Sequence, residues 1–375
     1  MTDDAIIKPP PAAMVALVDR AAYYGQSTIA DATRKTYRTE YGHFCRWAKS
    51  MSLPFDPPDV PTVAVYLAAL ADGLVEVHYL DRWGDPHVSK KPYKYGSIQR
   101  NYISIIHEVR ARGHEWPSAI DAITKVMHGI KYRRGDTKKR VAPLEIADLR
   151  LVLSKMRERR FEDLTIIRDR ALLSLGFFAA LRRKELVAVE YGDLEFVPEG
   201  LVLTIRRSKS DQFAEGVQLG ITPQTDKGVC PVALVRRYLD VSEIKSGPIF
   251  RRIDSRSDCY GDRALTSQVV AILVKQYAER AGLEAERFAG HSLRAGFATT
   301  AADKGRTLTQ IMRQGRWKDQ RTAQTYIRPA TIFADNPTAG LSDDPETCKH
   351  SGARWRAELE SAPYFVSDTG KRVTY

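Results

Sequence analysis

The stretch Gly290-His-Ser-Leu-Arg-Ala-Gly-Phe-Ala-Thr-Thr300 places a histidine and an arginine three residues apart, as His291 and Arg294. This spacing predicts a helix near 292–303 on which the two side chains share a face. A phosphate held by Arg294 would then lie beside an imidazole that can move a proton. An HxxR pair is common by itself, so its meaning depends on the rest of the chain.

A second basic position lies upstream, in Ala180-Leu-Arg-Arg-Lys-Glu-Leu186. It follows an apolar run that predicts a buried core helix over 163–180. Arg182 and Glu185 are three residues apart, so Glu185 is placed to orient a neighbouring basic group. Taken alone, the pair is equally typical of a salt bridge at the start of a helix.

Two further positions supply groups that suit phosphate chemistry. Tyr326 follows Trp317 by nine residues, and a Tyr becomes a nucleophile only where cations stabilise its phenolate and hold the electrophile in line. Lys209 lies near the tip of a predicted hairpin, where it could reach into a minor groove and protonate a leaving oxygen. Arg206 and Arg207 compete with it for that position.

The composition favours a polyanionic partner. The chain has 375 residues, a net charge of +12 and 43% hydrophobic residues, and its pI is about 9.4. It is long enough for two ordinary domains, and so basic a chain most often binds DNA, RNA or an anionic membrane. A basic cytoplasmic protein without such a partner is the alternative.

The sequence predicts neither a membrane span nor a secretion signal, since no apolar run reaches about 18–20 residues. The four cysteines are far apart, which suits a reducing cytoplasm. Cys348 and His350 form a C-x-H fragment without further metal-ligand candidates, so no metal is expected there.

The periodicity changes along the chain. The first half predicts a bundle of helices near 27–49, 63–74, 97–112 and 118–133, with a loop or short hairpin over 75–95. The first of these helices carries aromatic residues on one face and Arg34, Lys35 and Arg38 on the other. The second half predicts helices with a hairpin or three-stranded sheet over 194–220.

Between the halves lies a basic run, and it includes Lys131, Arg133, Arg134, Lys138, Lys139 and Arg140. It reads as an exposed linker that would lie well along a DNA backbone. A run that is only solvated is the alternative reading.

The ordered set of ALRRKEL, a hairpin Lys, GHSLR and GRW followed by a Tyr resembles the tyrosine recombinases, the group of lambda integrase and Cre, over nearly the whole chain. Each motif is weak alone, but their order and spacing are specific. The resemblance implies a mainly α fold with a small antiparallel β-sheet in the catalytic domain, shaped as a two-domain C-shaped DNA clamp. It further implies a flexible N-terminus (1–11), a helical, SAM-like core-binding domain (12–134), a basic linker (135–143), a catalytic domain (144–341) and a C-terminal extension (342–375).

The resemblance also implies roles for these residues. Arg182 and Arg294 would clamp the scissile phosphate, Lys209 would be the general acid, and His291 would be the general base or proton relay. Tyr326 would attack to give a 3′-phosphotyrosine.

Two more positions have implied roles. Glu185 would buttress the site. Trp317 stands where many members have His and Cre-like members have Trp, and it would pack and hydrogen-bond near the phosphate. Ala180 stands where a Gly often does.

The implied function is site-specific recombination or integration of double-stranded DNA, through a Holliday junction in a tetramer on two duplexes. No metal, ATP or organic cofactor is expected, and the free protein is expected to be monomeric or weakly associated. Its expected location is the bacterial cytoplasm, at the nucleoid. A type IB topoisomerase, which uses the same residues, and a non-catalytic DNA-binding protein on the same fold are the alternatives.

Overall fold

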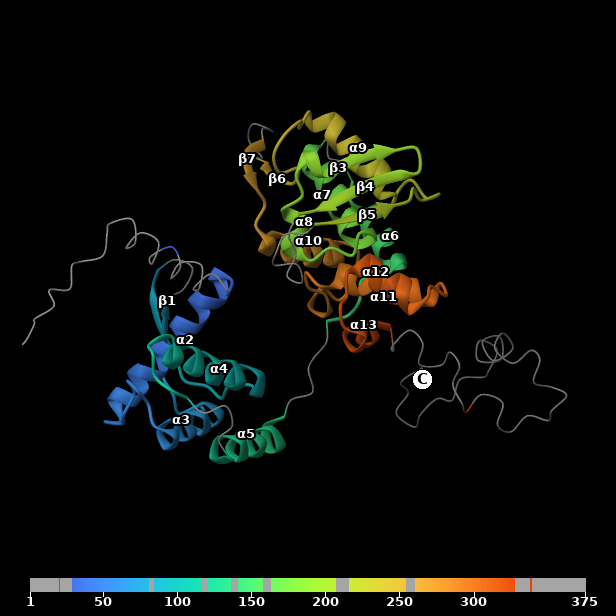
Figure 1. Cartoon of the computed structure of the whole chain (residues 1–375). Coiled ribbons are helices and arrows are strands. Elements are labelled where there is room, and N and C mark those ends of the chain that lie inside the picture. The colour runs from blue at the N-terminus through green and yellow to red at the C-terminus, as the bar shows by residue number, and fades with distance from the viewer. Residues whose placement is uncertain are drawn as a thin grey trace, which may run out of the picture. The chain divides into compact units, whose positions relative to one another are not determined.

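The computed structural model divides the chain into two compact units, Met1–Lys139 and Arg140–Tyr375, shown in Figure 1. The boundary lies inside residues 135–143, for which the sequence predicts a linker. The structure describes residues 20, 29–80, 84–116, 121–135, 141–157, 163–206, 216–253, 260–327 and 338.

Among its described residues, the first unit contains the helices α2 (Asp31–Ser50), α3 (Val60–Asp72), α4 (Tyr95–Ala111) and α5 (Asp121–Arg134). A two-stranded antiparallel hairpin, β1 (Val77–Leu80) and β2 (Pro86–Ser89), connects α3 to α4. The side chain of Asp59 caps α3 by accepting from the backbone N–H of Thr62. The predicted helices and hairpin are therefore present, with their ends shifted by a few residues.

The core of the first unit is built on the aromatic face of α2. Tyr41, Phe44 and Trp47 are buried, and the rings of Phe44 and Trp47 each lie 5.1 Å from the ring of Tyr66 on α3. Aromatic pairs at this separation add to the free energy gained by burying their surface. The apolar face predicted for this helix is the face that packs.

The second unit starts with three helices, α6 (Ile146–Lys155), α7 (Leu164–Phe178) and α8 (Arg183–Val187). A three-stranded antiparallel sheet follows, in the order β3 (Leu194–Val197), β4 (Gly200–Ile205) and β5 (Val217–Ile221). The remaining elements are α9 (Pro231–Ser242), a hairpin of β6 (Arg251–Ile253) and β7 (Tyr260–Ala264), α10 (Ser267–Arg280), α11 (Ser292–Asp303), α12 (Leu308–Gly315) and α13 (Gln320–Ile327).

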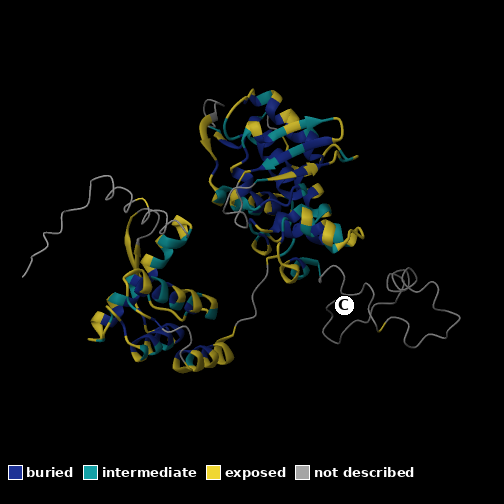
Figure 2. Ribbon diagram, viewed as in Figure 1, coloured by how far each residue is buried: buried dark blue, intermediate teal, exposed yellow. Residues whose placement is uncertain are grey.

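Helix α7 forms the centre of the second unit. Most of its residues are buried, and it packs against α9, α11, α6 and α8 (Figure 2). A helix that is buried on most of its sides is typical of a core position, and its buried charges Arg168 and Asp169 pair with each other at 2.7 Å. The apolar run that predicts this helix therefore marks the element on which the others are positioned.

The start of the second unit is attached to α11. The N–H groups of Ala142 and Leu144 donate to the carbonyls of Arg287 and Ser292, at 2.8 and 3.0 Å. Gly296 on α11 allows this approach, because a Cβ there would lie 1.7 Å from the carbonyl oxygen of Leu144. The strand-like segment before α6 is thus fixed beside the helix that carries Arg294.

No helix among the described residues is long and apolar enough to cross a membrane.

Candidate active site

The C-terminal end of α7 forms the floor of the site. The helix ends at Phe178, and Ala180 then takes a left-handed conformation with φ of +47°. Glycine favours this conformation because it lacks a Cβ, so an alanine at this position puts some strain on the turn. The turn directs the chain into α8 and exposes the carbonyls of residues 178–180 to side-chain donors.

Arg182 lies directly before α8 and is held by Glu185. Its Nη1 is 2.6 Å from Glu185 Oε1, and its backbone N–H donates to Oε2 at 2.9 Å. Glu185 is only 7% exposed. The predicted pairing is present, and it lies at the start of α8, where Arg182 is the N-cap and Glu185 is the third residue of the helix.

A second arginine, Arg316, also binds Glu185, with its Nη2 2.8 Å from Oε2. Burial by itself raises the pKa of Glu185, but Arg316 and then the backbone N–H and guanidinium of Arg182 outweigh that effect. The pKa of this carboxyl therefore lies below its ordinary value, and Glu185 is ionised between two cations at neutral pH.

Arg294 is the most enclosed cation of this group, at 3% exposure. Its Nη1 donates to the carbonyl of Ala180 at 2.5 Å, and its guanidinium lies 4.2 Å from the ring centre of Trp317. Within the described part of the chain, its Nη2 is buried and has no hydrogen-bond partner. Burial, and then the charges of Arg182 and Arg316, lower the pKa of Arg294 to about 9, so it remains charged at neutral pH.

His291 precedes α11 instead of lying within it. Its φ and ψ are −92° and −9°, and the helix starts at Ser292. His291 is exposed, whereas Arg294 in the first turn of the helix is buried. The prediction that both share one helical face is therefore corrected, although the two residues remain at the same end of α11.

Trp317 and Tyr326 are brought together by the packing of α11, α12 and α13. Their ring centres are 5.6 Å apart at 42°, and Trp317 contacts Gly315, where a Cβ would lie 1.8 Å from the Trp317 ring. The hydroxyl of Thr299 on α11 donates to the backbone carbonyl of Tyr326 at 3.0 Å. Tyr326 is half-buried beside Trp317, which in turn lies against Arg294.

The predicted hairpin position is only partly described. Lys209 and Arg207 lie outside the described residues. Arg206 at the end of β4 pairs with Asp193 at 2.6 Å and with Glu190 at 2.7 Å. Asp193, and then Glu190, raise the pKa of Arg206, which disfavours it as a proton donor in place of Lys209.

The basic residues predicted to bind DNA differ in their surroundings. Lys35 and Arg38 on α2 and Lys131 and Arg133 on α5 are exposed. Arg34 donates to the carbonyl of Ile29 and lies 3.7 Å from Asp31, and Arg134 pairs with Asp72 at 2.8 Å. Lys138, Lys139 and Arg140 lie outside the described residues, as do Cys348, His350 and residues 328–337.

Arg316 is the residue that sequence reasoning missed. It lies between Gly315 and Trp317, within a motif that we used only for its Trp. Its contact with Glu185 joins residues 131 positions apart, so no local spacing reveals it. The sequence carries one indication of its unusual backbone. Arg316 directly follows a glycine, and the residue just past the end of a helix often takes a left-handed conformation.

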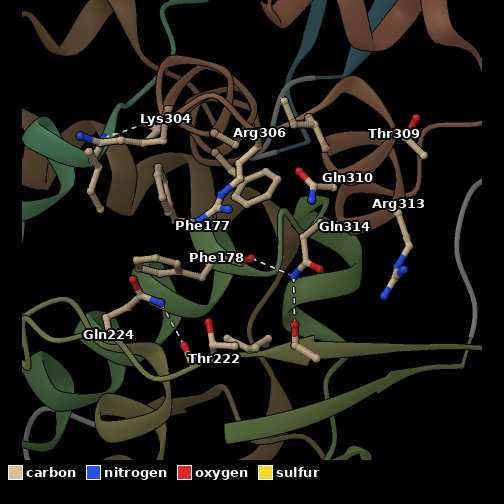
Figure 3. A pocket seen from close by; sticks show the side chains of 17 residues that line it. Phe177, Phe178, Thr222, Gln224, Lys304, Arg306, Thr309, Gln310, Arg313 and Gln314 are labelled. Atoms are coloured by element: carbon tan, nitrogen blue, oxygen red, sulfur yellow. Dashed lines mark hydrogen bonds between the residues drawn. The ribbon is translucent and has the colours of Figure 1, made fainter. Parts of the chain in front are cut away.

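A cavity of 690 Å³ adjoins this floor from another side (Figure 3). Phe177, Phe178 and α11 and α12 line it, and the side-chain amide of Gln314 donates to the carbonyls of Phe178 and Gly220 at 3.1 and 3.5 Å. Of the predicted site residues that the structure describes, none lines this cavity. In the described part of the chain, no group of three or more His, Cys, Asp or Glu side chains is placed to hold a metal ion.

Comparisons with known proteins identify the family of this chain. Residues 148–331 match the model of the phage integrase family. An integrase/recombinase XerD homolog of Selenomonas ruminantium is 33% identical over 311 residues, which cover 83% of this chain and 85% of that protein. The recombinase Cre of Escherichia phage P1 is 24% identical over 304 residues, covering 76% and 79% of the two chains.

The fold is also shared with a solved structure. The XerH site-specific recombinase bound to a palindromic difH substrate, in a post-cleavage complex, superposes with a TM-score of 0.51 and 17% identity, covering 77% of this chain and 73% of that one. The likeness to Cre is weaker than that to the XerD homolog, so Cre-like is a loose description of this chain. The identity and coverage shared with the XerD homolog, together with the match to the family model, show that this chain belongs to the phage integrase family, the tyrosine recombinases.

Proposed function

We propose that this protein is a site-specific DNA recombinase or integrase that breaks and rejoins strands through a covalent bond to Tyr326. The observation that carries the proposal is the buried guanidinium of Arg294, one donor nitrogen of which has no partner among the described residues, in the same cluster as Trp317 and Tyr326. Buried donors nearly always have partners, and a phosphate oxygen would supply one here. Because this nitrogen is covered in the unbound protein, binding requires the side chains above it to move aside.

The proposed reaction exchanges one phosphate ester for another. The Tyr326 hydroxyl attacks the phosphorus while its proton passes to His291. The bond to the 5′ oxygen breaks, and Lys209 protonates that oxygen, which leaves a 3′-phosphotyrosine and a 5′-hydroxyl. In the second step a 5′-hydroxyl attacks the phosphotyrosine and releases Tyr326.

In the proposed reaction, the cations of the site stabilise the transition state in place of a metal ion. Negative charge grows on the phosphate oxygens in the transition state, and fixed guanidiniums stabilise it without the reorganisation that water would need. Because the bond made is similar in energy to the bond broken, no ATP is needed. We therefore propose that cleavage and rejoining are independent of metal ions and ATP.

The partner and assembly follow from the same chemistry. The exposed cations of α2 and α5 would bind the phosphates of double-stranded DNA, and the related XerH structure contains a DNA substrate. Exchange between two duplexes needs four cleavages, so we propose a tetramer of protomers, with a Holliday junction between the two rounds of exchange. Such an enzyme would act at the bacterial nucleoid.

The test starts from selection of bound duplexes from a random and flanking genomic library. A nicked duplex that carries the selected site traps the cleaved strand, and the covalent adduct is measured on denaturing gels in the presence of EDTA. Wild type should form the adduct, and the Y326F variant should bind the duplex but form none. An adduct in the Y326F variant, or no adduct in wild type, would refute the proposal.

Relaxation of supercoiled plasmid separates recombination from topoisomerase activity. A recombinase should show strong preference for plasmid that carries the selected site. Equal relaxation of plasmid without the site would assign the type IB topoisomerase reaction instead.

A further inference from the structure

Arg316 lies in an unfavourable backbone conformation and is nevertheless almost fully enclosed. Its φ is +56°, in the left-handed region that favours glycine, and its side chain is 6% exposed. A buried guanidinium in such a conformation persists only where its surroundings hold it. Its contacts therefore indicate what it does.

These contacts connect the two arginines predicted to bind phosphate. Through Nη2, Arg316 pairs with Glu185, the carboxylate that holds Arg182. The same nitrogen lies 3.4 Å from the carbonyl of Ala180, which also accepts from Arg294. Arg316 thus shares one acceptor with each of the two arginines.

The charges of this group are unequal. Arg182, Arg294 and Arg316 are three cations, and Glu185 is the one carboxylate that pairs with any of them in the described part of the chain. Two positive charges therefore remain for a phosphate. Without Arg316, the charge of Glu185 would offset that of Arg182, and one positive charge would remain.

We propose that Arg316 is a positioning residue that neutralises Glu185, so that this carboxylate can orient Arg182 without cancelling the charge that Arg182 and Arg294 present to the scissile phosphate. This inference rests on the proposed function. It assigns no direct contact with DNA to Arg316, which acts through Glu185 and the Ala180 carbonyl.

A purely structural role for Arg316 is the competing explanation. Its Nη1 also lies 3.3 Å from the carbonyl of Ala179 and 3.2 Å from that of Gln314, so it helps to satisfy the end of α7. If that were its only role, loss of Arg316 and loss of Glu185 would each damage the fold, and the double loss would be worse than either. If Arg316 instead balances the charge of Glu185, the double loss should slow cleavage less than the loss of Arg316 alone.

The experiment is a double-mutant cycle on the cleavage step, with the nicked duplex from the binding selection as substrate. R316Q should lower the rate of adduct formation about 10–100-fold, as loss of supporting partners does at other preorganised sites, with little change in Kd for the duplex. The E185Q/R316Q double variant restores two net positive charges, so it should cleave faster than R316Q. R313Q, which removes an exposed cation of α12, is the matched control and should cleave like wild type.

The pH dependence gives a readout that a structural role would not change. Arg316 lowers the pKa of Glu185 and burial raises it, so the pKa of Glu185 should rise in R316Q. Protonation of Glu185 at low pH would then remove the excess carboxylate, and the rate deficit of R316Q relative to wild type should shrink as pH falls. The double variant should show no such change.

R316G guards against misfolding, because glycine suits the backbone at this position while lacking the guanidinium. The R316G and E185Q/R316G pair should reproduce the order of cleavage rates in the cycle, and the melting temperature of each variant, measured by circular dichroism, should lie above the assay temperature. A double variant slower than both single variants would overturn the inference while leaving the proposed function intact. If wild type forms no adduct, the proposed function fails, and this inference with it.

Discussion

Arg294 on α11 donates a 2.5 Å hydrogen bond to the carbonyl of Ala180, in the turn after α7. The last carbonyls of a helix lack intrahelical partners and carry the negative end of its dipole, so cations are favourable there. Gln314, Arg316 and Arg294 together supply donors to the carbonyls of residues 178, 179 and 180. The site is therefore positioned by the end of the most buried helix in its unit.

Replacement of Arg294 by Lys should separate charge from geometry. Lysine keeps a positive charge but cannot donate to Ala180 and to a phosphate oxygen in the fixed planar geometry of a guanidinium. We expect the single-turnover rate of adduct formation to fall about 10²–10³-fold, with little loss of DNA affinity. R280K, at an exposed arginine over the ring of Tyr277, is the control. A wild-type rate in R294K would contradict the role of Arg294.

The position of Tyr326 should depend on Thr299. In T299V the hydroxyl that donates to the Tyr326 carbonyl is absent, at a cost of about 1 kcal/mol. Since misplacement by about 1 Å can cost about 10²-fold in rate, we expect slower adduct formation by up to that factor. T299S keeps the donor and should stay near wild type. Equal rates of adduct formation in T299V and T299S would contradict this dependence.

Acid should weaken the contribution of Glu185 to stability. The arginines hold the pKa of Glu185 below its ordinary 4.5, so the folded state binds this proton more weakly than the unfolded chain does. The carboxylate therefore stabilises the fold above about pH 4.5, and this stabilisation is lost as pH falls through the lowered pKa. Denaturant unfolding of wild type and E185Q should show a gap in free energy at neutral pH that narrows below pH 4.5. A gap that is constant with pH would be inconsistent with this coupling.

Salt dependence should distinguish the cations of α2. Lys35 and Arg38 are exposed, whereas Arg34 lies near Asp31 and donates to Ile29. Each lost phosphate contact lowers the slope of log affinity against log salt by about 0.9. We expect the K35Q/R38Q double variant to reduce the slope in binding titrations, and R34Q to change it less. A larger change of slope in R34Q than in K35Q/R38Q would indicate that another face of the first unit binds DNA.

Much of the fold is predictable because it depends on local spacing. The helices near 27–49 and 163–180 are present as α2 and α7, and the predicted sheet is present as β3–β5. The hairpin of β6 and β7 was not predicted, since Arg251–Ile253 and Tyr260–Ala264 are short and show no clear alternation. Its two strands are instead defined by their pairing with each other.

The sequence predicts those site residues whose type suits one chemical task. It does not predict residues whose role depends on contacts with distant parts of the chain. The family resemblance implies a shared site for Arg182, Arg294 and Tyr326, and in the structure Arg294 lies against Trp317, which packs on Tyr326. Arg316 and the buried Glu40, which pairs with Arg100 at 2.6 Å, depend on partners 131 and 60 positions away. Their roles follow only from tertiary packing, which no pattern in one sequence specifies.

The attachment of Leu144 to α11 has a mechanical consequence. Ala142 and Leu144, at the start of the second unit, lie against the helix that carries Arg294. Backbone hydrogen bonds and the close contact at Gly296 hold them there. Tension in the connecting segment is therefore delivered first to the phosphate-binding end of α11. If the first unit binds DNA as proposed, the start of the second unit would connect that binding to the end of α11 that carries Arg294.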